Sequence, residues 1–206
     1  MVRPGDAITP ARWAGKEARL ARMDRLCGLA LVACDGALLD AALSPAAAEW
    51  NGERTAIVLG TAYGCHATNE EYYKGVVRDG ALGASPRLFA YTLPSSPVGE
   101  VSIHYGVRGP ASTLAGGLAS GIDALVEGVA LVANGRADRA IVCAADVATP
   151  LLARLLAAHA HRGSDGREIL PPDGVCDAAA AIVVERAADA AARGAVPRGR
   201  LAGAAA

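Results

Sequence analysis

The chain has 206 residues, enough for one globular domain, or two small ones, with a hydrophobic core. It has 20 Lys and Arg residues against 21 Asp and Glu residues, and this net charge of −1 gives no field that would favour nucleic acid. Hydrophobic residues make up 52%, but the long apolar stretch 122–133 is interrupted by Asp123 and Glu127. No stretch reaches the roughly 20 residues of a membrane span, so the sequence predicts a soluble protein.

The N-terminus and the cysteines both predict a cytoplasmic protein. Residues 1–22 begin with Arg3, Pro4 and Asp6 and contain no apolar core of the signal-peptide type. The cysteines are odd in number and scattered, without a C-x-x-C pair, which argues against a disulfide framework and a zinc site. They are Cys27, Cys34, Cys65, Cys143 and Cys176, and most are expected to be buried as small apolar residues.

In chain order, residues 1–22 read as a lead-in without clear periodicity, and one domain is predicted over 23–206. Apolar residues at helical spacing predict a helix that Asp24 caps and that Ser44-Pro45 ends. The short β-branched run Thr55–Gly60 reads as a buried strand. A polar segment from Tyr63 to Asp79 suits a helix that follows a loop.

The rest of the chain continues to alternate strands with helices. Beyond an irregular, proline-containing stretch, the pattern predicts a strand at 112–117, a helix at 119–134, a strand at 139–144, a helix at 151–161, a loop at 163–174, a strand at 179–185 and a short helix at 186–193. Strands that are apolar throughout and alternate with helices predict an α/β fold, with a mainly parallel sheet covered by helices on both faces.

Seven segments, in order, carry a family resemblance. They are Met23–Ala33, Ile57–Thr61, Pro97–Pro110, Thr113 with Gly116–Gly121, Asn134–Asp138, Asp173-Gly174 and Ala181–Glu185. Together they resemble the first half of a β-ketoacyl-acyl carrier protein synthase of the thiolase superfamily. The resemblance implies a thiolase-like half with a mainly parallel mixed sheet.

The main departure from the family pattern is Leu118. Residues 116–121 read Gly-Gly-Leu-Ala-Ser-Gly, where the family usually has Thr-Ala-Cys-Ala-Ser/Ala-Gly, so the resemblance places Leu118 at the nucleophile position. In the family that cysteine accepts an acyl chain as its thiolate, and leucine has neither a lone pair nor an ionisable proton for this step. The histidines or asparagine that active synthases take from their C-terminal half also have no counterpart in these 206 residues.

The resemblance therefore predicts a non-catalytic, chain-length-factor-like subunit without a cofactor. Its partner would be an active ketosynthase of a type II fatty-acid, polyketide or aryl-polyene pathway, and through it an acyl carrier protein. In the superfamily the nucleophile strands of two subunits pair antiparallel, which predicts a heterodimer interface and a role in setting acyl-chain length. The residues expected at that interface are His104, Ser112, Thr113, Leu114, Ala115 and Gly116.

Two other interpretations stay open. Cys65 follows Gly64 in a loop and precedes His66, so a small acyl-transferring or condensing enzyme could use this thiol, or residues from another chain. Alternatively, a truncated paralogue could form a homodimer with only a binding role.

The remaining candidates give little support to a further site. His159 and His161, two residues apart at a helix end, point in different directions and make a poor metal pair. Ser120 lacks the Gly-x-Ser-x-Gly spacing of a hydrolase and is expected to pack at a helix start.

Overall fold

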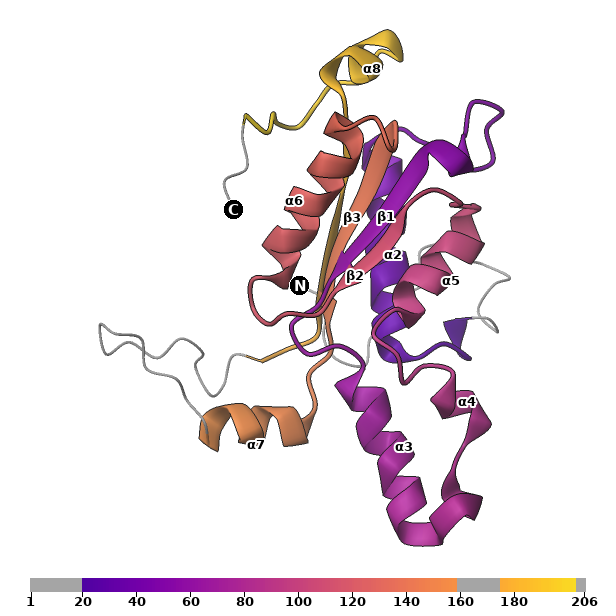
Figure 1. Cartoon of the computed structure of the whole chain (residues 1–206), viewed down its shortest axis with the longest axis vertical. Coiled ribbons are helices and arrows are strands. Elements are labelled where there is room, and N and C mark those ends of the chain that lie inside the picture. Colours follow the sequence, from indigo (N-terminus) through magenta and orange to yellow (C-terminus); the bar gives the residue numbers. More distant parts are fainter. Residues whose placement is uncertain (1–19, 159–174, 203–206) are drawn as a thin grey trace, which may run out of the picture.

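The computed structural model describes residues 20–158 and 175–202. Its middle layer is a four-stranded sheet with the order β2-β1-β3-β4 (Figure 1). β1 is parallel to both β2 and β3, whereas β4 is antiparallel to β3. The strands are β1 (Thr55–Gly60), β2 (Ala111–Leu114), β3 (Arg139–Asp146) and β4 (Ala178–Glu185). The predicted α/β class with a mainly parallel, mixed sheet is confirmed.

Helices cover both faces of the sheet, also as predicted. α6 packs on one face against β1 and β3, while α2 and α5 pack on the other (Figure 1). The α-helices are α2 (Arg25–Asp40), α3 (His66–Asp79), α4 (Pro86–Phe89), α5 (Ser96–Tyr105), α6 (Ser120–Ala133), α7 (Pro150–Ala158) and α8 (Ala187–Ala192), and the 3-10 helices are η2 (Gly52–Arg54) and η3 (Gly80–Gly83). Among these described helices, none combines the length and apolarity that crossing a membrane requires.

Capping and apolar spacing explain the longest helix. The Asp24 side chain accepts a hydrogen bond from the Cys27 N–H at 2.8 Å, which satisfies one of the free amide groups at the start of α2. Cys27 and Cys34 lie on the buried face of this helix, and Cys143 is buried in β3. Cys65 is buried as well, whereas Cys176 is exposed.

The sheet separates two apolar cores. Leu26, Leu31 and Ile141 belong to the core between the sheet and α2 and α5, while Val58 and Leu131 belong to the core under α6. All six residues of β1 are buried, as expected for a strand inside a layered α/β fold.

Close packing of α6 on the sheet depends on a glycine. A side chain at Gly128 would collide with Val142 of β3, so only a hydrogen at this position lets the helix lie so near. This close contact between α6 and β3 helps to set the position of α6 relative to the sheet.

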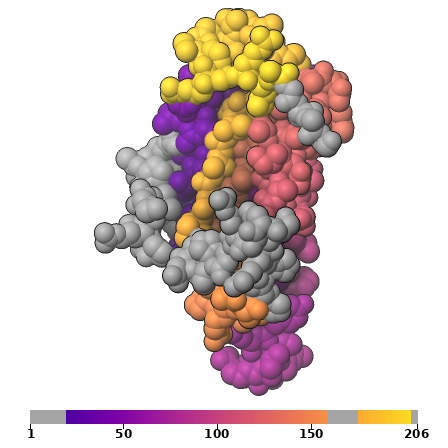
Figure 2. Space-filling model, turned by 90° about the vertical axis from the view of Figure 1, so that its left-hand side faces the viewer, coloured from indigo at the N-terminus to yellow at the C-terminus, as the bar shows by residue number. Residues whose placement is uncertain are grey.

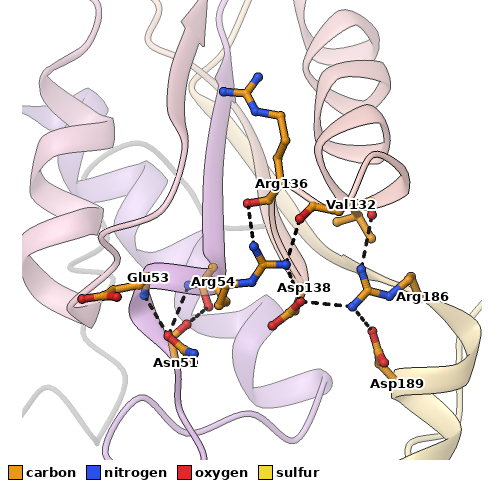
Figure 3. Close-up of polar contacts among 10 residues, drawn as sticks. Asn51, Glu53, Arg54, Val132, Arg136, Asp138, Arg186 and Asp189 are labelled. Atoms are coloured by element: carbon orange, nitrogen blue, oxygen red, sulfur yellow. Dashed lines mark hydrogen bonds and ion pairs between the residues drawn. The ribbon is translucent and has the colours of Figure 1, made fainter.

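An ion-pair network connects the strands at the end of the sheet where β1 and β3 begin and β4 ends (Figure 3). Arg54, before β1, and Arg186, after β4, both contact the Asp138 carboxylate, at 2.8 and 3.1 Å. The same guanidinium groups donate to carbonyls at the end of α6, including those of Val132 and Gly135. Asp138 thus connects β1, β3, β4 and α6 at the edge remote from the turn that contains Leu118.

Two predicted elements differ in extent. The strand expected over 112–117 ends at Leu114, because the chain turns at Gly116 and Gly117. The helix expected to reach His161 is described only to Ala158, so His159, His161 and the whole predicted 163–174 loop lie outside the described residues. The proposed boundary between 1–22 and 23–206 stays a prediction.

Candidate functional site

The loops after the three parallel strands meet at one edge of the sheet. β1, β2 and β3 end there at Gly60, Leu114 and Asp146. In open α/β sheets, ligands bind outside the carboxyl ends of the strands, where loops from several strands converge. This edge contains both residues singled out from the sequence, Leu118 and Cys65.

Leu118 lies in a tight turn between β2 and α6. Gly117 has a φ of 103°, a left-handed conformation that favours glycine. The Gly116 N–H donates to the Ser120 Oγ at 2.8 Å, and the Ser120 N–H donates to the Gly117 carbonyl at 3.0 Å. Ser120 is buried, whereas the Leu118 side chain is 59% exposed. The turn therefore presents residue 118 outward at the start of a helix.

Strand β1 passes directly behind this turn. A side chain at Gly60 would collide with the Ser120 carbonyl, so the start of α6 rests against the end of β1. Residue 118 is thereby held at the carboxyl edge by the fold, independently of its own side chain. A leucine in this place offers apolar contact but no nucleophile.

Asp146 holds the neighbouring loop and was missed by sequence reasoning. Its carboxylate accepts hydrogen bonds from the Thr61 hydroxyl at 2.8 Å and from the Ala62 and Tyr63 N–H groups at 3.0 and 2.9 Å. The Thr61 hydroxyl in turn accepts from the Gly64 N–H at 2.9 Å. An acidic residue at the end of a buried strand was the available signal, but its partners lie more than 80 residues away in the sequence.

Cys65 lines a pocket of about 240 Å³ beside this loop. Its Sγ donates a hydrogen bond to the Thr92 carbonyl at 2.7 Å and accepts one from the Asn69 Nδ2 at 3.4 Å. Burial raises the pKa of the Cys65 thiol, which keeps it protonated near neutral pH. These surroundings weigh against Cys65 as a nucleophile.

His66, next to Cys65, does not activate the thiol in this arrangement. Its Nε2 lies 3.5 Å from the Thr149 hydroxyl, whereas the Cys65 Sγ is hydrogen-bonded to Thr92 and Asn69. Burial lowers the pKa of the His66 imidazole, so the ring is neutral near pH 7. Across the described part of the chain, no three His, Cys, Asp or Glu side chains gather as metal ligands.

The residues expected at a subunit interface gather around β2. Ser112, Thr113 and Leu114 lie in this edge strand, and Ala115 and Gly116 follow it, both exposed. The Ser112 and Thr113 hydroxyls are buried and have no hydrogen-bond partner among residues 20–158 and 175–202. His104 is in the last turn of α5 and packs edge-on against the Tyr105 ring, with centroids 4.7 Å apart.

Comparison with known proteins identifies the family. Residues 5–190 match the model of the β-ketoacyl synthase N-terminal domain, which is most of the chain. The chain belongs to the β-ketoacyl synthase family. Curated relatives of this β-ketoacyl synthase domain include the tetracenomycin polyketide synthase ketoacyl synthase alpha subunit of Streptomyces glaucescens, 38% identical over 128 residues, or 59% of this chain and 29% of that protein. The 3-oxoacyl-[acyl-carrier-protein] synthase 2 of Staphylococcus aureus is 32% identical over 61% of this chain and 30% of that protein.

Solved structures confirm the thiolase-like ketosynthase fold. The ishigamide ketosynthase/chain length factor superposes with a TM-score of 0.69 and 28% identity, over 90% of this chain and 49% of that chain. A β-ketoacyl synthase from Burkholderia phymatum STM815 gives a TM-score of 0.73 at 21% identity, over 94% of this chain and 49% of that chain, and it shows the fold alone. The β-ketoacyl synthase domain thus spans about half the length of the solved chains that it matches.

Proposed function

We propose that this chain is a non-catalytic, chain-length-factor-like subunit that pairs with an active ketosynthase. The observation that carries the proposal is Leu118, exposed in a preformed strand-turn-helix where the family motif has its cysteine. The turn holds residue 118 outward between a strand and the start of a helix, yet the leucine side chain at this position cannot accept an acyl group. Activity would then come from the partner subunit, in fatty-acid, polyketide or aryl-polyene synthesis.

The relatives support this proposal at two levels. Those that the sequence matches include ketosynthases of polyketide and fatty-acid synthesis. A solved relative at 28% identity is a ketosynthase/chain length factor. Both kinds of relative therefore point to acyl condensation on a carrier protein as the setting in which this subunit works.

Among the described residues β2 is an edge strand, and its outer side provides a means of pairing. The Ile57 and Thr61 N–H groups of the β1 segment donate to the Pro110 and Leu114 carbonyls, so these carbonyls face β1. Because main-chain groups alternate along a strand, those of Ala111 and Thr113 face away from β1. A partner strand that runs antiparallel to β2 would satisfy them, and Leu118 would lie beside the contact, where it can limit the partner's acyl chamber.

Co-expression with a type II ketosynthase from the same organism tests the proposal. We expect one stable complex in size-exclusion chromatography, with longer or more uniform products than the ketosynthase makes alone. Thr113→Pro removes an N–H that faces away from β1 and should abolish the complex, whereas Thr113→Val keeps that N–H and should preserve it. A failure of the wild-type chain to bind any ketosynthase or to change its products would refute this function.

The alternative enzyme, which would use Cys65, makes a different prediction. Incubation with acyl carrier protein thioesters should leave this chain without an acyl adduct if it is a partner subunit. A stable adduct on Cys65, found by peptide mass spectrometry, would favour the enzyme instead.

A further inference from the structure

Helix α3 projects beyond the carboxyl edge of the sheet. Its magenta surface forms one end of the molecule in Figure 2, and α4 lies beside it in Figure 1. Among the described elements, α3 packs mainly against η3 and α4, which follow it in the chain, rather than against the sheet. The position of α3 relative to the sheet therefore depends on contacts at its first turn, where the pocket beside Cys65 lies.

The Cys65 sulfur is the middle member of a hydrogen-bonded relay at this turn, formed by Asn69, Cys65 and Thr92. The Asn69 Nδ2–H donates to Sγ at 3.4 Å, and the thiol S–H donates to the Thr92 carbonyl at 2.7 Å. Consecutive hydrogen bonds of this kind polarise and strengthen one another. Cys65 and Asn69 belong to the start of α3, whereas Thr92 lies between α4 and α5, so the relay joins two separate segments.

The two segments that the relay joins line the same pocket. Cys65 and Asn69 line it from α3, and Thr92 and Pro94 line it from the connection before α5. Pro94 also packs on Gly64, because a Cβ at Gly64 would lie 3.4 Å from the Pro94 ring. The close contact at Gly64 and the hydrogen bond at Cys65 therefore act on the same short segment.

Both segments are also attached to the body of the fold by other side chains. The Thr68 hydroxyl donates to the Asp24 carboxylate at 2.9 Å, which holds the first turn of α3 to the start of α2. The Tyr91 hydroxyl donates to the Glu100 Oε1 at 2.9 Å, which holds the connection to α5. The Cys65 thiol then links the two attached segments directly.

We propose that Cys65 is a positioning residue, whose thiol holds the first turn of α3 and the segment 92–94 together as walls of this pocket. The relay needs the thiol proton, because a thiolate has no hydrogen to donate to the Thr92 carbonyl. An adduct on the sulfur would remove the same donor. Because the relay lies within one chain, this role does not depend on the proposed function or on a partner subunit.

The competing interpretation is that Cys65 packs only as a small apolar residue, and the two interpretations rank two substitutions in opposite order. Serine keeps a donor for the Thr92 carbonyl, whereas alanine does not, so we expect Cys65→Ser to unfold at a higher temperature than Cys65→Ala. Cys143 is the matched control, since it is buried in the core under α2 and its sulfur lies 4.0 Å from the Ala30 carbonyl. There the alanine variant should be the more stable. A Cys65→Ala variant at least as stable as Cys65→Ser would overturn the proposal.

Hydrogen exchange of the full chain locates the effect. The Thr92 and Ser96 N–H groups donate to the Phe89 and Leu93 carbonyls, so their protection reports on the segment that the thiol holds. Cys65→Ala should accelerate exchange of both amides about fivefold, as expected for the loss of one hydrogen bond. Cys65→Ser should keep them within about twofold of the wild type. Unchanged exchange in Cys65→Ala would contradict the positioning role.

Asn69→Ala provides a second variant if Cys65→Ala does not fold. It removes the other hydrogen bond of the sulfur without changing Cys65. We expect faster exchange at Thr92 in Asn69→Ala than in Glu71→Ala, which changes an exposed position on the same helix. Equal exchange at Thr92 in these two variants would overturn the relay.

Discussion

Leu118 occupies a turn whose shape is set by other residues. The Ser120 hydroxyl holds the Gly116 N–H, Gly117 provides the left-handed conformation, and Gly60 gives the helix start room against β1. None of these contacts involves the side chain at 118. The residue at 118 can therefore change while the turn keeps its geometry, as the proposed non-catalytic subunit requires.

We predict that Ser120→Ala destabilises the fold by about 1 kcal/mol, because the Gly116 N–H loses its acceptor. Urea denaturation followed by circular dichroism measures the difference. Ser95→Ala is the control, since the Ser95 hydroxyl makes no capping hydrogen bond at the start of α5. Equal effects of the two substitutions would show that Ser120 does not hold the turn.

We predict unequal cysteine reactivity. The raised pKa of Cys65 and its burial should make its alkylation by iodoacetamide slow at pH 7.5, and the rate should rise as the pH passes the ordinary thiol value of 9.0. Exposed Cys176 should react first. Peptide mass spectrometry gives both rates. Rapid labelling of Cys65 at pH 7.5 would show that its thiol is not held in the protonated form.

At the scale of elements, the loop after β1 depends on β3. We predict that Asp146→Asn costs about 2–3 kcal/mol, because a carboxylate that accepts from two N–H groups and a hydroxyl is replaced by a neutral amide with one acceptor oxygen. Hydrogen exchange of Ala62 and Tyr63 should accelerate in the variant. Unchanged protection of these amides would show that the loop is held by other contacts.

The network around Asp138 predicts a dependence on pH. Arg54 and Arg186 lower the pKa of the Asp138 carboxyl below its ordinary 3.8. The charged form therefore stabilises the folded state above that value, and its contribution is lost as the pH falls through 3.8 and below. Between pH 5 and 3, Asp138→Asn should lose less stability than the wild type in thermal unfolding. Parallel curves for the two proteins would contradict this assignment.

Local patterns predicted most elements but not their long-range contacts. The run Thr55–Gly60 is the observed β1, because a short β-branched segment closed by glycine has few other structures available. The predicted strand at 112–117 extends three residues past the observed end of β2 at Leu114, because the sequence pattern did not reveal the turn at Gly116 and Gly117. The role of Asp146 could not be read from the sequence, because it depends on strands from distant segments lying side by side.

At the scale of the whole molecule, the alternation of strands and helices predicted the layered fold, and the family resemblance predicted a subunit contact at the strand before Leu118. Strand order and the antiparallel direction of β4 are set by packing among segments far apart in the chain. Among the described residues they place β2 at the edge of the sheet beside Leu118. We propose that a ketosynthase pairs with this edge.

The central claim is that this chain assists condensation without carrying an acyl group. Intact-protein mass spectrometry of the co-purified complex with an active ketosynthase, after incubation with an acyl carrier protein thioester, tests it most directly. We predict an acyl adduct on the ketosynthase and an unmodified mass for this chain. An adduct on this chain, or no complex to measure, would contradict it.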